Sequence, residues 1–339
     1  TCALPICVDG FRVDVIWLLI KDEQFRDNPP NPAYVSTQPD INRTLSVYNA
    51  DRPEIHALIS EMRAVLDRYQ DRVLIGEIYL PFERLMTYYG DNLSGAQLPF
   101  NFALIHTVWN AKAIATLIAE YENGLPPGGW PNWVLGNHDQ PRIAARVGSA
   151  QARIAAMLLL TLRGTPTMYY GDEIGMPRVE VAPQFVQDPW ERNEPGLGVG
   201  RDPSRTPMQW DRYSHAGFSS AQPWLPVEPL YRERNVALLR HDPRSILSLY
   251  RELTDLRRGY PAVHSGSTRV IGADDNVLSY ERIAGEQRIV VMLNFGPEQR
   301  PLPLFAGQKT RILLSTHLDR EGLVNIEWLR PNEGIAVLA

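Results

Sequence analysis

Arg72-Val73-Leu74-Ile75-Gly76-Glu77 is a short apolar run that ends on a carboxylate, and it decides the fold class. Upstream of it, Pro53 opens a stretch that reaches Tyr69 and in which apolar residues recur at helical spacing. Proline suits the first turn of a helix, and this spacing predicts an amphipathic helix with one buried face. A helix that leads directly into a buried strand is typical of α/β proteins.

The same alternation of strand and helix continues along the chain. Continuous apolar strands at this rhythm predict an α/β fold with a parallel sheet covered on both faces, as in a TIM-type barrel or a doubly wound sheet. Five such strands are visible, which are too few to close an eight-stranded barrel. The strands are expected at 8–14, 72–77, 98–102, 133–137 and 165–171, and the helices at 53–69, 104–121, 142–162 and 246–258.

Two further regions differ from this pattern. Residues 177 to about 233 are rich in Gly, Pro and Trp and lack periodicity, which predicts a long loop system of the kind that often carries function. Beyond the α/β domain at 8–260, residues 261–339 predict a small all-β sandwich domain of antiparallel strands. Its strands are expected at 277–283, 288–294, 310–315 and 334–338.

Charge and composition exclude some kinds of partner. The 34 basic and 39 acidic residues give a net charge of -5, so the chain has no basic field for a phosphate backbone. The longest apolar stretch, Ile154 to Leu162, is too short to span a bilayer. We therefore expect no nucleic acid and no membrane among the partners, and the oligomeric state is left open.

The N-terminal end holds both cysteines, Cys2 and Cys7. They are too close together and too isolated to frame a disulfide scaffold or a metal site, so we expect no metal and no cofactor. Thr1-Cys2-Ala3-Leu4-Pro5-Ile6 lacks an initiating Met and matches one translated frame of a common sequencing adapter, so residues 1–7 are interpreted as an assembly artefact. Without a cysteine scaffold, the cytoplasm is the expected compartment.

Three carboxylates follow the ends of predicted strands. Asp14 ends the first strand, Glu77 ends the second, and His138-Asp139 follows a later one. Side chains alternate faces along a strand, so Arg12 points the same way as Asp14. In a barrel these groups converge at the carboxyl ends of the strands, where barrel enzymes keep their active sites. Each group alone has a plain reading, as a structural ion pair or a helix cap.

A pair of carboxylates at one mouth is the equipment of glycoside hydrolysis, in which one attacks and the other donates a proton. We expect the negative charges of Asp14 and Asp139 to raise the pKa of Glu77 and keep it protonated enough to act as an acid. Arg12 beside Asp14 acts in the opposite sense, because a positive charge favours an ionised carboxylate.

The motifs, taken in order, resemble the signature run of the α-amylase family (glycoside hydrolase family 13), in its α-glucosidase and oligo-1,6-glucosidase branch. The resemblance covers nearly the whole chain after Cys7. It rests on the runs Gly10-Phe11-Arg12-Val13-Asp14, Ile75-Gly76-Glu77, Gly136-Asn137-His138-Asp139, Gly164-Thr165-Pro166 and Tyr169-Tyr170-Gly171-Asp172-Glu173-Ile174-Gly175-Met176. A further run, Gly200-Arg201-Asp202-Pro203-Ser204-Arg205-Thr206-Pro207-Met208-Gln209-Trp210, resembles the loop after the eighth strand in the α-glucosidase branch.

The resemblance implies a fold and its boundaries. Residues 8–260 would be the C-terminal five βα units of a TIM (β/α)8 barrel, strands 4 to 8. The small β-sandwich domain would follow. The family's first three strands and its first sugar-binding motif have no counterpart here, so the chain is expected to be truncated at its N-terminus.

The resemblance also implies roles for individual residues. Asp14 would be the nucleophile, Glu77 the general acid and base, and Asp139 the carboxylate that grips sugar hydroxyls and stabilises the transition state. His138 would donate to the same sugar, and Arg12 would orient Asp14.

Two residues would set specificity. Arg205 would reach the non-reducing glucose and close the end of the site. Val15, which follows the nucleophile, would bear on the choice between α-1,4 and α-1,6 bonds, although a valine in a strand is ordinarily packing.

The expected function is therefore a retaining, exo-acting α-glucosidase, and its partner a small oligosaccharide or disaccharide. One alternative is a glucosyl-transferring relative of the sucrose isomerase or trehalose-forming type, which uses the same residues. Another is a non-catalytic homologue that serves as a transporter subunit. Such relatives tend to lose the carboxylates that this chain retains.

Five strands leave two open apolar edges, and such edges pair with other chains. We therefore expect the chain expressed alone to aggregate, to lack a cooperative thermal transition and to leave p-nitrophenyl α-glucoside uncleaved. Calorimetry, light scattering and a colorimetric assay check this. A monomeric and active preparation would contradict it.

Overall fold

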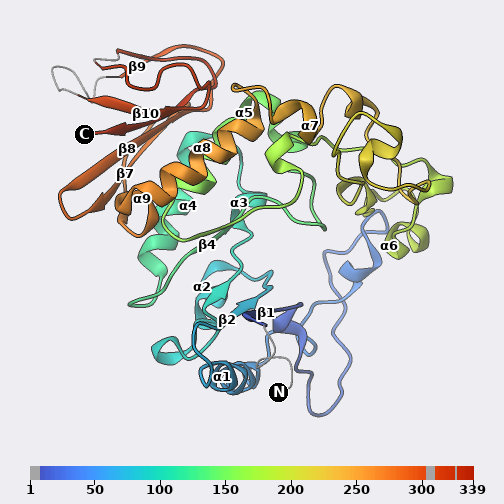
Figure 1. Cartoon of the computed structure of the whole chain (residues 1–339). Helices are drawn as coiled ribbons and strands as arrows, with labels where there is room; N and C mark the ends of the chain where they lie inside the picture. The colour runs from blue at the N-terminus through green and yellow to red at the C-terminus, as the bar shows by residue number, and fades with distance from the viewer. Residues whose placement is uncertain (1–7, 303–309, 325–326) are drawn as a thin grey trace. The chain divides into compact units, whose positions relative to one another are not determined.

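The computed structural model describes residues 8–302, 310–324 and 327–339 (Figure 1). Residues 1–7, interpreted above as an artefact, lie outside the described residues together with both cysteines. The chain divides into two compact units. Unit 1 comprises residues 1–102, 120–133 and 193–199, and unit 2 comprises residues 103–119, 134–192 and 200–339.

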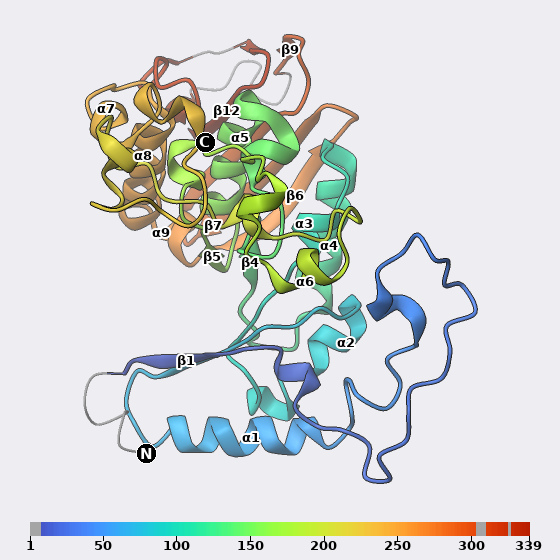
Figure 2. The same cartoon turned by 90° about the vertical axis from the view of Figure 1, so that its right-hand side faces the viewer.

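Unit 1 is built on a three-stranded parallel sheet of β1 (Gly10–Val13), β2 (Val73–Gly76) and β3 (Leu98–Pro99), with β2 in the centre. The parallel arrangement is as predicted, and so is the helix before β2, α1 (Ile55–Leu66). Figure 2 shows α1 running alongside the strands on one side of the sheet. The unit also contains α2 (Phe82–Thr87) and the 3-10 helices η2 (Ile16–Leu18), η3 (Asp40–Arg43) and η4 (Asp91–Leu93).

A glycine allows β1 and β2 to approach each other. A Cβ added at Gly10 would lie 2.3 Å from the carbonyl oxygen of Val73, its partner in the register. No side chain fits that space, so the residue type at this position is fixed by the strand pairing.

Three elements contain residues of both units: α4 (Ala111–Gly124), β4 (Asn132–Val134) and α6 (Pro189–Asn193). The single helix expected at 104–121 is wrong, because α3 (Ala103–His106) and α4 are separate helices. The side chain of Asn110 accepts a hydrogen bond of 2.8 Å from the backbone N–H of Ala113 and so caps the start of α4. An asparagine in a helical pattern competes for backbone groups in this way and begins a new helix.

Unit 2 contains the remaining helices of the α/β part. As predicted, α5 (Ile143–Thr161) and α8 (Ile246–Gly259) are its long helices, although α5 is broken at Gly148. The predicted loop system holds only short helical pieces. By length and apolar composition α5 could cross a membrane, but buried core helices share these properties. Of the most apolar 18-residue stretch of α5, 56% is buried inside the protein. β5 (Thr165–Thr167) pairs with β4. The other helical elements are η5 (Asp172–Ile174), η6 (Pro183–Phe185), α6 (Pro189–Asn193), η7 (Asp202–Ser204), η8 (Ser214–Gly217), η9 (Pro229–Arg232), α7 (Val236–Leu239) and α9 (Pro261–His264).

The C-terminal part of unit 2 is an antiparallel β domain, as predicted. Its five-stranded sheet has the order β10 (Arg311–Ser315), β12 (Gly334–Leu338), β8 (Gln287–Asn294), β7 (Val277–Ala284) and β6 (Ser267–Ala273). A second sheet pairs β9 (Arg300–Pro301) with β11 (Trp328–Leu329), and one apolar core joins the two sheets through Leu329, Val290 and Ile335. β6 and α9 were not expected, because β6 is exposed along much of its length and lacks a clear alternation.

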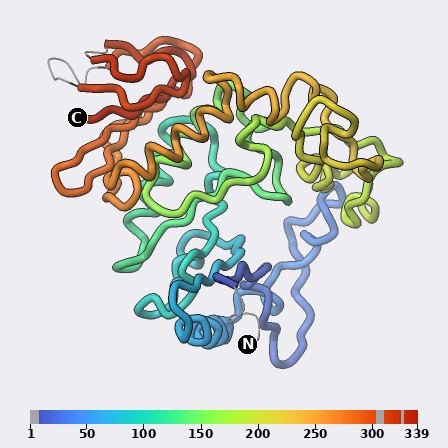
Figure 3. Tube along the Cα trace, viewed as in Figure 1, coloured from blue at the N-terminus to red at the C-terminus, as the bar shows by residue number. Residues whose placement is uncertain are grey.

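The β domain packs on the long helices of the same unit. From α5, Gln151 Nε2 donates to Asn332 Oδ1 at 2.6 Å, and Arg153 Nε donates to the carbonyl of Thr316 at 2.7 Å. The expected domain limit at residue 260 stays a prediction. Five βα units of one barrel at 8–260 stay a prediction. Figure 3 follows the chain through both units.

Candidate active site

Asp14 and Glu77 lie side by side in unit 1 because of the register between β1 and β2. Val13 pairs with Gly76, so the next residue of each strand is one of the two carboxylates. The backbone N–H of Glu77 donates to the carbonyl of Val13 at 3.1 Å, which continues the parallel ladder to that point. Both groups stand at the carboxyl ends of parallel strands, as predicted.

Arg12 joins the two carboxylates. Its Nη2 lies 2.7 Å from Glu77 Oε2, and its Nη1 forms an ion pair with Asp14 Oδ1. Arg12 and Asp14 therefore lie on one face of the strand, as their spacing predicted. One guanidinium in contact with both carboxylates fixes their relative orientation.

The two carboxylates differ sharply in exposure. The side chain of Asp14 is 72% exposed, whereas that of Glu77 is 3% exposed. Burial disfavours the charged form and raises the pKa of Glu77, and Asp14 raises it further. The N–H of Val15 and the charge of Arg12 oppose this shift. The direction matches the expectation from sequence, but the main cause is burial rather than the neighbouring charge of Asp14.

Val15 does not lie in a strand, because β1 ends at Val13. Its backbone is left-handed, with φ 38° and ψ 46°, which is an unfavourable conformation for a β-branched residue. In this conformation its N–H donates to Glu77 Oε2 at 3.0 Å. The contribution of Val15 to the site in unit 1 is thus a backbone donor, which no side-chain pattern indicates.

In unit 2, His138, Asp139 and Arg205 come together. Arg205 Nη2 lies 2.5 Å from Asp139 Oδ1, and Arg205 Nε donates to the carbonyl of His138 at 3.0 Å. His138 Nε2 lies 3.5 Å from the same oxygen, Asp139 Oδ1. These contacts all involve Oδ1, and within the described residues Oδ2 makes no hydrogen bond or ion pair, so it remains able to accept from a ligand.

A buried ion pair that sequence reasoning missed supports this group. Arg201 grips Asp188 with two parallel bonds, Nε to Oδ2 at 2.8 Å and Nη2 to Oδ1 at 2.7 Å, and its Nη1 lies 3.4 Å from Asp139 Oδ1. The side chain of Asp188 is fully buried, and hydrogen bonds from Arg201 hold its pKa well below the usual range. Arg201 lies in the motif 200–210, but Asp188 lies in a segment without periodicity and belongs to none of the motifs found in the sequence.

The double tyrosine of the quoted motif holds the Arg205 loop. The hydroxyl of Tyr169 donates to the carbonyl of Ser204 at 3.0 Å, and that of Tyr170 donates to the carbonyl of Thr206 at 2.7 Å. These two carbonyls flank Arg205 in the chain, so the position of its backbone is set from both sides.

The predicted residues thus form two groups. Arg12, Asp14, Val15 and Glu77 gather in unit 1, and His138, Asp139 and Arg205 gather in unit 2. One mouth shared by all three carboxylates stays a prediction. Within residues 8–302, 310–324 and 327–339, no group of three or more His, Cys, Asp or Glu side chains is arranged to hold a metal ion.

The chain matches a known family model and is similar to known glucosidases. Residues 4–266 match the family model described as alpha amylase, catalytic domain. The chain is 34% identical to maltase A1 of Drosophila melanogaster over 319 residues, covering 88% of this chain and 55% of that protein. It is 31% identical to oligo-1,6-glucosidase of Parageobacillus thermoglucosidasius over 369 residues, covering 95% of this chain and 63% of that protein. The chain spans about half the length of the curated relatives it matches.

Solved structures of enzymes are also similar to this chain. The alpha-glucosyl transfer enzyme XgtA superposes with a TM-score of 0.87 at 28% identity, covering 99% of this chain and 65% of that one. Trehalulose synthase MutB from Pseudomonas mesoacidophila superposes with a TM-score of 0.83 at 25% identity, covering 99% of this chain and 66% of that one.

The raised pKa of Glu77 predicts a pH-dependent cost to stability. A carboxyl whose pKa is higher in the folded state than in the unfolded chain destabilises the fold at neutral pH, and the cost disappears below its ordinary pKa. We therefore expect Glu77→Gln to become more stabilising, or less destabilising, as the pH rises from 4 to 7. Urea unfolding of the complete protein at both pH values measures this. A difference from wild type that does not change with pH would contradict the assignment.

Loss of Arg201 should leave Asp188 as an unpaired buried charge. We expect Arg201→Ala to lower the free energy of unfolding by about 3 kcal/mol. The exposed Arg212→Ala in the same loop system is the matched control, and its effect should stay within about 0.5 kcal/mol. Adding Asp188→Asn to Arg201→Ala should restore part of the loss, because no buried charge then remains. If Arg201→Ala lowered the free energy of unfolding no more than Arg212→Ala does, the Arg201–Asp188 ion pair would be rejected as a support of the loop.

Proposed function

The chain belongs to the α-amylase family of glycoside hydrolases, and on this premise we propose that it acts as a retaining, exo-acting α-glucosidase. Its substrates would be short α-glucosides, from which it releases glucose at the non-reducing end. The family's TIM-barrel-type fold with a C-terminal antiparallel sheet domain is consistent with the strands and helices of both units.

The observation that carries the proposal is the pair of unlike carboxylates at the ends of β1 and β2. Asp14 is exposed and can reach a substrate, whereas Glu77 is buried and has a raised pKa. A double displacement needs this division, because the nucleophile must be ionised while the acid still holds its proton. Arg12 contacts both groups and thereby holds them at a fixed spacing.

In the first step a carboxylate oxygen of Asp14 attacks the anomeric carbon of glucose. The bond to the leaving oxygen breaks as Glu77 transfers its proton to that oxygen, and a glucosyl ester of Asp14 forms with inversion. In the second step Glu77, now ionised, takes a proton from water while the water oxygen attacks the same carbon. The ester bond breaks, Asp14 is released, and the second inversion restores the original anomer.

The group in unit 2 is proposed to bind the sugar that reacts. Asp139 Oδ1 is contacted by Arg201, Arg205 and His138. Asp139 Oδ2 is therefore proposed to accept a hydrogen bond from a hydroxyl of the sugar. Hydrogen bonds that strengthen in the transition state contribute to catalysis in glycosidases. Arg205 would close the site beyond the non-reducing glucose and so make the enzyme exo-acting.

Transfer of the glucosyl group to another sugar is the second candidate. It is favoured by the similarity to an alpha-glucosyl transfer enzyme and to a trehalulose synthase. The first step is the same, and only the acceptor differs. Sugar products from sucrose and maltose distinguish the candidates: free glucose supports hydrolysis, and new disaccharides support transfer. The choice between α-1,4 and α-1,6 bonds, to which Val15 is proposed to contribute, is read from the same assays.

Asp14→Asn in the complete protein tests the mechanism. We expect kcat on maltose to fall by roughly 10⁴-fold, because the amide cannot form the ester intermediate. Asp9→Asn is the matched control: Asp9 precedes the same strand, is 86% exposed and should change kcat little. Glu77→Gln should impair maltose far more than p-nitrophenyl α-glucoside, whose leaving group needs no proton in the first step.

Two results would reject this assignment. One is glucosidase activity that survives Asp14→Asn. The other is an inverted anomer as the first product detected by NMR, since a nucleophilic Asp14 requires retention.

A further inference from the structure

A cavity in unit 2 has none of the proposed catalytic or sugar-binding residues in its wall. Its volume is about 330 Å³, within the range of small-molecule sites. Its wall is formed by residues of α5, η5, α7, the start of α8 and their flanking turns. Figure 1 labels α5, α7 and α8. The apolar part of the wall is Ile174, Leu239 and Ile246, and the polar part is Ser149, Arg153 and Arg234.

Among the described residues, the side chains of the two arginines of this cavity donate hydrogen bonds to backbone carbonyls. Arg153 Nε donates to the carbonyl of Thr316 at 2.7 Å, and Arg234 Nη1 donates to the carbonyl of Gly175 at 3.3 Å. In the described part of the chain, neither guanidinium has a carboxylate within 4.0 Å. Asp242 acts on Arg153 electrostatically without a contact. A guanidinium carries five donors, so each arginine retains most of its hydrogen-bonding capacity.

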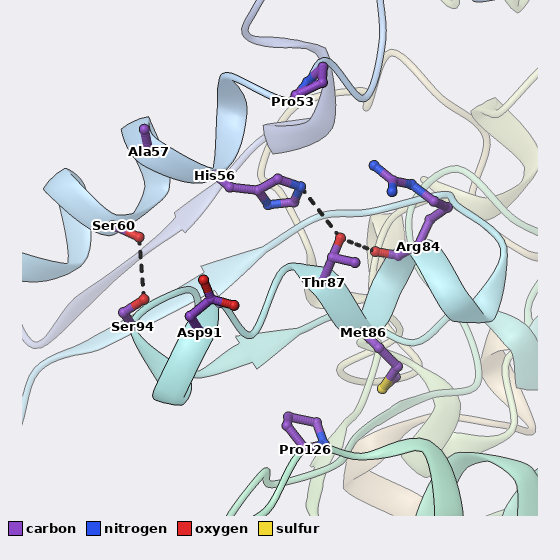
Figure 4. A pocket seen from close by; sticks show the side chains of 11 residues that line it. Pro53, His56, Ala57, Ser60, Arg84, Met86, Thr87, Asp91, Ser94 and Pro126 are labelled. Carbon is purple, nitrogen blue, oxygen red and sulfur yellow. Dashed lines mark hydrogen bonds between the residues drawn. The ribbon is translucent and has the colours of Figure 1, made fainter.

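A larger cavity in unit 1 offers a comparison, because its arginine already has a carboxylate partner. It measures about 730 Å³ and is lined by α1, α2 and the turn after α2 (Figure 4). Its Arg84 is already paired with Asp51 at 2.7 Å, and Asp91 adds a negative charge to the wall. His56 has its pKa lowered mainly by burial, so it adds no positive charge at neutral pH. The wall of that cavity therefore combines a paired arginine with an acidic residue, whereas Arg153 and Arg234 line their cavity without a carboxylate contact among the described residues.

We propose that the cavity lined by Arg153 and Arg234 binds a phosphate-type oxyanion, either free phosphate or the phosphate ester of a small sugar. Planar guanidinium groups bind phosphate oxygens through two parallel hydrogen bonds, and two arginines from different elements can serve a tetrahedral anion from two sides. The apolar wall and the volume leave room for a sugar-sized group beside the anion.

Two features favour an anion at this place. Burial lowers the pKa of Arg153, which means that its charge lacks solvation there, and a bound anion would supply what water does not. α5 is interrupted at Gly148, whose φ is 81° and ψ 162°, so a new helical segment begins at Ser149 in the wall of the cavity. The start of a helix carries N–H groups without carbonyl partners and favours negative charge.

Titration calorimetry on the complete protein tests the proposal, with inorganic phosphate, glucose 6-phosphate and glucose as probes at constant ionic strength. We expect saturable binding of glucose 6-phosphate, of phosphate, or of both, and none of glucose at this site. Binding of both means that the anion alone suffices, and binding of the ester alone means that the sugar is also recognised. Arg234→Ala should weaken binding at least about tenfold, because one charge-assisted contact is lost.

Arg232→Ala is the matched control, since Arg232 is exposed, lies two residues away and does not line the cavity. Its affinity should equal that of wild type. Ser149→Asp is a second variant, which places a negative charge in the cavity without removing an arginine and should also weaken binding. No binding of either phosphate compound, or equal affinity in wild type, Arg234→Ala and Ser149→Asp, would overturn the proposal.

Discussion

The parallel pairing of β1 with β2 is the constraint on which the candidate site depends. It places Val13 beside Gly76, and therefore Asp14 beside Glu77, at the ends of neighbouring strands. The strands can approach each other only because Gly10 has no side chain where the carbonyl of Val73 lies. A shift of the register by one residue would point Glu77 to the opposite face of the sheet and separate it from Arg12.

Within that frame, burial rather than charge separates the two carboxylates. Both touch Arg12, yet only Glu77 is enclosed, and desolvation is the main reason for its raised pKa. The N–H of Val15 donates to the same carboxylate and favours its ionised form, as Arg12 does. Glu77 therefore lies between opposing influences, which suits a group that must both give and take a proton in one catalytic cycle.

Unit 2 organises its polar residues differently, through paired charges in a loop system without regular structure. Arg201 joins the buried Asp188 to Asp139, and the two tyrosine hydroxyls hold the backbone around Arg205. Such a network replaces the hydrogen bonds that a helix or strand would provide, so a long loop can position side chains. In the cavity of Arg153 and Arg234 the two guanidinium groups donate instead to backbone carbonyls, and among the described residues no carboxylate contacts them.

The sequence by itself determined the alternation of the main strands and helices before residue 260, the antiparallel C-terminal domain and the positions of Arg12, Asp14, Glu77, His138, Asp139 and Arg205 at strand ends or in the loop 200–210. These follow from periodicity and motif, which are local properties of the chain. It did not reveal the break between α3 and α4, where one side-chain cap outweighs a helical pattern. Only the tertiary structure decided that Glu77 is enclosed while Asp14 is open, that the N–H of Val15 turns toward Glu77, and that Arg201 meets Asp188. Enclosure, backbone direction and charge pairing arise between residues that are far apart in the chain or in an aperiodic loop, so no local pattern encodes them.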